Sequence, residues 1–92
     1  MTPEGKIEDY LKTECKKQGF LCYKFTAPSN SGVPDRIVIG NGKTIFVELK
    51  APGKKPRPLQ IAVHKLMKQK GALVYVIDNK KSVDNFIKDV LL

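Results

Sequence analysis

The 92-residue chain contains few of the residues that build disulfide, zinc or membrane proteins. Its two cysteines and one histidine are too few for a disulfide-rich fold or a Cys/His zinc site. No apolar run approaches the ~20 residues that span a bilayer, and residues 1–5 have no signal-peptide pattern. We therefore expect a cytoplasmic protein, with Cys15 and Cys22 reduced and packed in the core.

Acidic residues are also scarce. The chain has 9 Asp and Glu against 17 Lys and Arg, a formal net charge of +8. No acid lies between Ala51 and Ile77, where the basic residues are Lys54, Lys55, Arg57, Lys65, Lys68 and Lys70. Such a stretch favours contact with nucleic-acid phosphates, although a basic charge can also serve solubility alone.

The length predicts one domain over residues 1–92, with a core small enough that dimerisation would stabilise it. Apolar periodicity and turn residues predict an α/β chain of order αβββαβα. The expected helices follow Thr2, Pro58 and the capping residue Ser82. The expected strands cover residues 20–25, 36–39, 43–50 and 72–77.

For two of these elements, the sequence also predicts which side chains are buried. The second helix is expected to pack through an apolar stripe made of Leu59, Ala62, Val63, Leu66 and Met67. The last strand, residues 72–77, is a continuous apolar run, which is typical of a strand that is buried on both faces.

The sequence Gly40-Asn41-Gly42 predicts a tight hairpin turn between the second and third strands. Because a hairpin pairs residues at equal distances from its turn, Asp35 and the segment from Glu48 to Lys50 should meet at one edge of the sheet. Glu48 and Lys50 are two apart and should share a face, whereas Leu49 should point into the core.

Two carboxylates and an ammonium group at one edge can form a metal site. Mg²⁺ takes oxygen ligands, so Asp35, Glu48 and the backbone carbonyl of Leu49 are candidate ligands. Lys50 could orient an attacking water or stabilise the transition state. The alternative is an ordinary surface salt bridge at a strand end.

The extended pattern around these residues resembles a known nuclease family. Pro34-Asp35 followed by Glu48-Leu49-Lys50 resembles the PD-(D/E)XK nuclease motif. The segments 24–25, 32–36, 46–53 and 58–60 are together similar to the VRR-NUC subgroup, in its small stand-alone form carried by phages and prophages.

The resemblance implies a restriction-endonuclease-like core, with a mixed central sheet flanked by helices. It implies an endonuclease that cuts DNA with Mg²⁺ or Mn²⁺, and no nucleotide cofactor. Asp35 and Glu48 would bind the metal, Lys50 would serve catalysis and Gln60 would support the site. A glutamate of the first helix would also contribute, with Glu4 preferred over Glu8.

Nothing in the chain matches a sequence-reading motif, so we expect selection by DNA structure. The family resemblance implies branched substrates such as Holliday junctions and a homodimer of two-fold symmetry. The expected DNA contacts are Lys24, Ser31, Lys54, Lys55 and Arg57. His64 is expected to be a surface residue. The alternatives are a basic DNA-binding module that does not cut, and a restriction-type nuclease that reads a base sequence.

Overall fold

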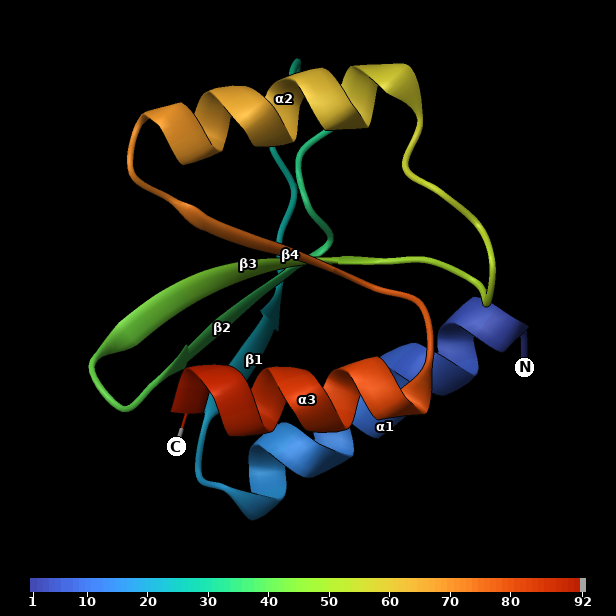
Figure 1. Cartoon of the computed structure of the whole chain (residues 1–92), viewed down its shortest axis with the longest axis vertical. Coiled ribbons are helices and arrows are strands. Elements are labelled where there is room, and N and C mark those ends of the chain that lie inside the picture. The colour runs from blue at the N-terminus through green and yellow to red at the C-terminus, as the bar shows by residue number, and fades with distance from the viewer. Residues whose placement is uncertain (92) are drawn as a thin grey trace.

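The computed structural model describes residues 1–91 as one four-stranded sheet with helices on both faces (Figure 1). The elements are α1 (Pro3–Lys17), β1 (Leu21–Lys24), β2 (Arg36–Gly40), β3 (Lys43–Leu49), α2 (Pro58–Gln69), β4 (Leu73–Ile77) and α3 (Lys80–Leu91). This order confirms the predicted αβββαβα arrangement. The predicted domain range also includes residue 92, which lies outside the described residues.

The sheet is mixed, as expected. Its strand order is β1-β2-β3-β4, with β2 antiparallel to both β1 and β3, and β4 parallel to β3. Because parallel strands need a crossover connection, α2 links β3 to β4 and covers one face of the sheet. Helices α1 and α3 lie together on the opposite face (Figure 1).

The hairpin between β2 and β3 has the predicted turn. Gly40 pairs with Lys43, so that Asn41 and Gly42 form a two-residue loop, and both have positive φ angles, 52° and 77°. Positive φ at both loop positions matches the right-handed twist of the strands. The register then pairs Arg36 with Val47, which brings Asp35 next to the end of β3.

The apolar core lies between the sheet and the α1/α3 layer. Its buried residues include Ile7, Leu11 and Cys15 of α1. The strands and α3 contribute Val38, Ile45, Val47, Leu49, Ile77, Val83, Phe86, Ile87 and Val90. Cys15 is buried and Cys22 is half-buried against the core, and both are free, so the predicted packing of the two cysteines is confirmed. Within residues 1–91, no helix is both long and apolar enough to cross a membrane.

The predicted apolar stripe of α2 is partly wrong. The helix buries Gln60 and His64, with Val63 and Met67 half-buried beside them, while Leu59, Ala62 and Leu66 are exposed. The physical reason lies on the sheet, where a buried carboxylate faces α2 and selects polar partners. Apolar periodicity cannot detect a helix face that is chosen by a polar contact.

Strand β4 is not buried on both faces, contrary to the prediction. It is the edge strand of the sheet, and Leu73, Tyr75 and Val76 are 45%, 37% and 45% exposed. Only Val74 and Ile77 of this strand are buried. An apolar run predicts that a segment forms a strand, but it does not predict whether that strand is central in the sheet or at its edge.

The cap of α3 also differs from the prediction. The helix begins at Lys80, and the Ser82 backbone N–H donates to Asn79 Oδ1 at 2.7 Å. The Asn79 backbone N–H in turn donates to Ser82 Oγ at 3.2 Å. Asn79 is therefore the capping residue, and Ser82 is its reciprocal partner three positions later.

Candidate active site

Five polar side chains meet where β2 begins and β3 ends, beneath α2. They are Asp35, Glu48, Lys50, Gln60 and His64. The hairpin register brings Asp35 to β3, where the Leu49 backbone N–H donates to Asp35 Oδ2 at 2.9 Å. Leu49 itself is 2% exposed and lies in the core, as its position in the strand predicted.

Glu48 is the centre of this cluster and is only 2% exposed. Its Oε2 accepts a hydrogen bond from Gln60 Nε2 at 3.0 Å and lies 3.3 Å from Lys50 Nζ. Its Oε1 is buried and has no hydrogen-bond partner. A buried carboxylate oxygen without a partner is costly, because it has lost water and gained nothing in return.

The pKa of Glu48 reflects the same surroundings. Burial, and after it the nearby charge of Asp35, raise the pKa of this carboxyl from 4.5 to about 7. Lys50 acts in the opposite direction through its hydrogen bond and charge. A buried carboxylate whose pKa is raised by a neighbouring carboxylate is suited to holding a cation.

Gln60 joins the site to the start of α2. Its Oε1 accepts from the Arg57 backbone N–H at 2.8 Å, which satisfies one of the free donors at the helix N-terminus. Its Nε2 simultaneously donates to Glu48. The side chain therefore caps the helix and holds the carboxylate at once.

His64 is buried, which corrects the prediction of a surface residue. It is 5% exposed, and its Nε2 lies 3.8 Å from Glu48 Oε1. Burial lowers the pKa of His64, and the charges of Lys68 and Lys50 lower it further, so the ring is neutral at pH 7. The four-residue spacing from Gln60 was the available sequence signal, since it puts both side chains on one helix face.

The two candidate glutamates of α1 have different surroundings. Glu8 Oε2 accepts from Arg36 Nε at 2.9 Å, and Arg36 directly follows Asp35. Glu4 is exposed in the first turn of the helix. The contact with Arg36 thus brings Glu8 close to the start of β2, directly after Asp35.

The predicted DNA contacts are all exposed. Lys54, Lys55 and Arg57 lie in the segment that joins β3 to α2, between Lys50 and Gln60. Lys24 ends β1 and pairs with Arg36, and Ser31 belongs to the loop before Asp35. These side chains therefore belong to segments that begin or end at the carboxylate cluster.

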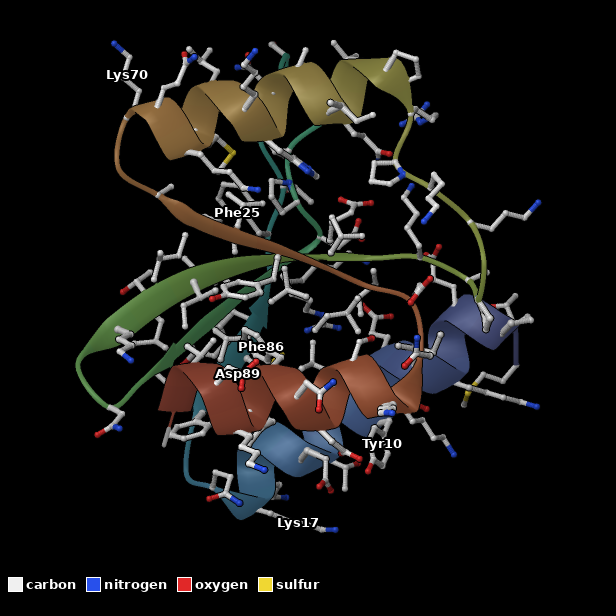
Figure 2. All side chains as sticks on the ribbon, in the orientation of Figure 1. Tyr10, Lys17, Phe25, Lys70, Phe86 and Asp89 are labelled. Atoms are coloured by element: carbon white, nitrogen blue, oxygen red, sulfur yellow. The ribbon has the colours of Figure 1, made fainter. Side chains whose placement is uncertain are left out.

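Aromatic side chains near the site serve packing in part. Phe25 lies between α2 and the sheet (Figure 2) and packs edge-on against Phe46, with ring centroids 5.1 Å apart. Tyr23, two residues earlier, is 54% exposed. Of Tyr23 and Phe25, Tyr23 is the one whose ring is exposed to solvent.

The donor set of the site fits Mg²⁺ or Mn²⁺ through two carboxylates. Within the described part of the chain, no group of three or more His, Cys, Asp and Glu side chains could hold a metal ion. Mg²⁺ typically uses one or two carboxylates and keeps several waters, so two are sufficient. The buried, unpartnered Oε1 of Glu48 is the atom that a cation would satisfy.

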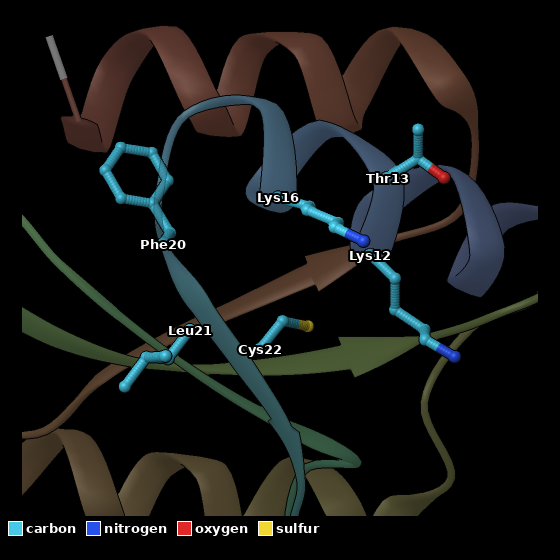
Figure 3. Close-up of a pocket in the computed structure, with 6 residues that line it drawn as sticks. All are labelled: Lys12, Thr13, Lys16, Phe20, Leu21 and Cys22. Atoms are coloured by element: carbon cyan, nitrogen blue, oxygen red, sulfur yellow. The ribbon is translucent and has the colours of Figure 1, made fainter.

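A pocket of about 350 Å³ lies elsewhere, along α1 and β1. Figure 3 shows its lining residues, which are Lys12, Thr13, Lys16, Phe20, Leu21 and Cys22. It contains two ammonium groups, no carboxylate and none of the five clustered side chains. Its chemistry does not favour metal binding.

Known proteins resemble this chain over most of its length, although no family model matches it. A solved structure described as a VRR_NUC domain has a TM-score of 0.89 and 34% sequence identity, and the match covers 98% of this chain and 99% of that one. The chain belongs to the VRR_NUC family. This confirms the resemblance and the PD-(D/E)XK-like fold that were predicted from the motifs.

A second similar protein comes from a phage. The candidate nuclease p44 of Acyrthosiphon pisum secondary endosymbiont phage 1 is 47% identical over 78 residues, which is 84% of each chain. The present VRR_NUC chain thus resembles a phage protein of nearly the same extent.

Proposed function

We propose that this VRR_NUC domain, residues 1–92, is an endonuclease that hydrolyses phosphodiester bonds in branched DNA such as Holliday junctions. It requires Mg²⁺ or Mn²⁺ and works as a homodimer. The observation that carries the proposal is the buried carboxylate of Glu48, which has one oxygen held by Gln60 and Lys50 and the other unpartnered, with the charge of Asp35 nearby. The family and the name of the phage relative support nuclease activity.

Asp35, Glu48 and the Leu49 carbonyl would hold the cation. A bound Mg²⁺ or Mn²⁺ eases deprotonation of a water and neutralises charge on a phosphate. The Leu49 N–H keeps Asp35 turned toward β3, so both carboxylates converge on one place. A site formed by two neighbouring strands is held more rigidly than one formed by loops alone.

Lys50 and Gln60 have different roles in this proposal. Lys50 is 14% exposed in its side chain, so its ammonium group can reach both Glu48 and an incoming phosphate or water. Gln60 fixes the Glu48 rotamer from α2. A first-helix glutamate, Glu4 or Glu8, would complete the site, and the contact between Glu8 and Arg36 supports Glu8.

The DNA would lie across the exposed basic segment between β3 and α2. Lys54, Lys55 and Arg57, with Lys24 and Ser31, would contact phosphates around the carboxylate cluster. Phosphate contacts orient the duplex without reading its bases, which agrees with selection by DNA structure. The phage relative supports a phage or prophage origin, with the bacterial cytoplasm as the place of action.

The exposed edge of the sheet supports a dimer. Strand β4 has an unpaired edge, and its Leu73, Tyr75 and Val76 side chains are partly exposed. Exposed apolar edges favour association with another copy of the chain. A two-fold dimer would present two sites to opposing strands of a two-fold junction.

The test is cleavage of labelled four-way junction, flap and linear duplex DNA with Mg²⁺, Mn²⁺ or EDTA. We expect junction cutting that needs metal and falls at least about 100-fold in Asp35→Ala, Glu48→Gln and Lys50→Ala, since single electrostatic groups contribute about that much. Binding without cutting by the wild-type protein would instead support a non-catalytic DNA-binding module. Cutting of linear duplexes at a fixed base sequence would support a restriction-type enzyme.

A further inference from the structure

His64 is a buried polar residue that the proposed reaction does not yet use. Its Nε2 has no hydrogen-bond partner, and the atom that it faces, Glu48 Oε1, also has none. The two atoms are 3.8 Å apart, about 0.8 Å beyond an ordinary hydrogen bond. A buried histidine that served packing alone would be expected to have its ring nitrogens satisfied.

His64 lies close to both segments that contain the candidate carboxylates, the end of β3 with Glu48 and the loop that leads to Asp35. Gln60 and His64 are one turn apart on α2, so the first holds Oε2 of Glu48 while the second faces Oε1. The ring also interacts with the backbone of Gly32, in the loop that leads to Asp35. Gly32 in turn packs against Leu59 of the same helix.

The charged neighbours of the ring agree with a role at the cluster. The groups that act on it are Lys50, Lys68 and Asp35. Lys68 lies one turn further along α2, and the other two belong to the candidate site. Active-site hydrogen bonds are often long before ligands bind and shorten in the complex, so 3.8 Å is compatible with a contact that forms on metal binding.

We propose that His64 is a positioning residue: in its neutral form with the proton on Nε2, the Nε2–H donates to Glu48 Oε1 and, with Gln60, fixes the carboxylate from two consecutive turns of α2. The inference rests on the proposed metal site. Partners that orient a metal-ligating carboxylate typically change metal affinity by about 10–100-fold when they are removed. Removing the imidazole should therefore weaken metal binding even when no DNA is present.

The experiment measures Mn²⁺ and Mg²⁺ binding by calorimetry on the DNA-free protein. It compares wild type, His64→Leu, His64→Gln and the control Leu66→Ala, whose side chain is exposed on the same helix. Circular dichroism in EDTA establishes that each variant is folded, and His64→Met replaces His64→Leu if the latter is not. We expect about 10–100-fold weaker binding of both metals in His64→Leu, recovery of most of the loss in His64→Gln, and no change in Leu66→Ala.

Each other outcome overturns the inference in a different way. Wild-type affinity in folded His64→Leu would leave the metal site intact and remove His64 from it. A loss confined to Mn²⁺, which His64→Gln does not recover, would make His64 a direct ligand, because imidazole suits transition metals better than Mg²⁺. No metal binding by the wild-type protein would overturn the proposed metal site and this inference with it.

Discussion

At the scale of single residues, the contacts of the site converge on Glu48. Its carboxylate is buried, and four neighbours act on it. They are Asp35, which precedes β2, Lys50, which follows β3, and Gln60 and His64 of α2. Burial would normally favour the neutral acid, and the ammonium group and the amide of two neighbours favour the anion. A divalent cation would shift this balance to the anion.

This balance predicts how stability depends on pH in the absence of metal. In the unfolded chain Glu48 releases its proton near the ordinary 4.5, whereas in the folded protein its pKa is about 7. The folded state therefore binds more protons between these values, and stability should fall as the pH rises through this window. Melting temperatures in EDTA, measured across that range, would show the fall.

Glu48→Gln is the control for this titration, since glutamine has the same shape and no titratable proton. The melting temperature of Glu48→Gln should therefore fall less steeply with rising pH than that of the wild-type protein. Equal slopes in the two proteins would show that Glu48 does not have a raised pKa. With Mn²⁺ present, the wild-type slope should weaken or reverse, because a cation displaces the bound proton.

At the scale of secondary-structure elements, the β2–β3 hairpin sets the distance between the two carboxylates. Its two-residue loop places Arg36 opposite Val47 and so brings Asp35 to Leu49. A shift of register by one residue would turn Glu48 from the α2 side to the core side. The turn is therefore a determinant of the site, although it lies at the far end of both strands.

Gly42→Ala should destabilise the protein by about 1 kcal/mol, because φ there is 77° and a β-carbon is strained in the left-handed region. A β-carbon at this position has no atom within 4 Å, so the loss would come from the backbone alone. Gly42→Asn should lose less, since asparagine tolerates this conformation. Urea denaturation checks both variants, and equal losses would contradict the turn argument.

At the scale of the whole molecule, the proposed function makes the basic segment between β3 and α2 the place where DNA binds. Lys54→Ala/Lys55→Ala should weaken binding to all sequences and reduce the salt slope by about 1–2, since each phosphate contact contributes about 0.9. The matched control is Lys12→Ala/Lys16→Ala, which removes the same charge from the pocket of Figure 3. Fluorescence anisotropy at several salt concentrations measures the slopes. Equal effects of the two double variants would mean that net charge alone decides binding.

The edge strand offers a second test at this scale. Light scattering should report a wild-type dimer and a monomer for Val76→Lys, because a lysine on an exposed edge opposes pairing with another copy. The control is Tyr23→Lys on β1, the opposite edge of the sheet, where the side chain is 54% exposed. A wild-type monomer, or a dimer that only Tyr23→Lys disrupts, would contradict the proposal that the dimer forms through β4.

The sequence alone was sufficient for features that depend on neighbouring residues. The order of elements follows from periodicity, the hairpin from Asn41-Gly42, and the inward side of Leu49 from alternation along a strand. The prediction that Asp35 and the end of β3 meet also needed only the turn and counting outward from it. Local conformational preferences contain this information because each involves a few consecutive residues.

Only the tertiary structure decided which faces are buried and which atoms meet. It buried Gln60 and His64 in place of Leu59 and Leu66, left β4 at an edge, and paired Glu8 with Arg36. These outcomes depend on contacts between segments far apart in the chain, and one polar contact outweighed the apolar pattern of α2. The position of His64 at Glu48 Oε1 is an outcome of the same kind. Its spacing from Gln60 puts both side chains on one helix face, but only the tertiary packing brings that face against Glu48.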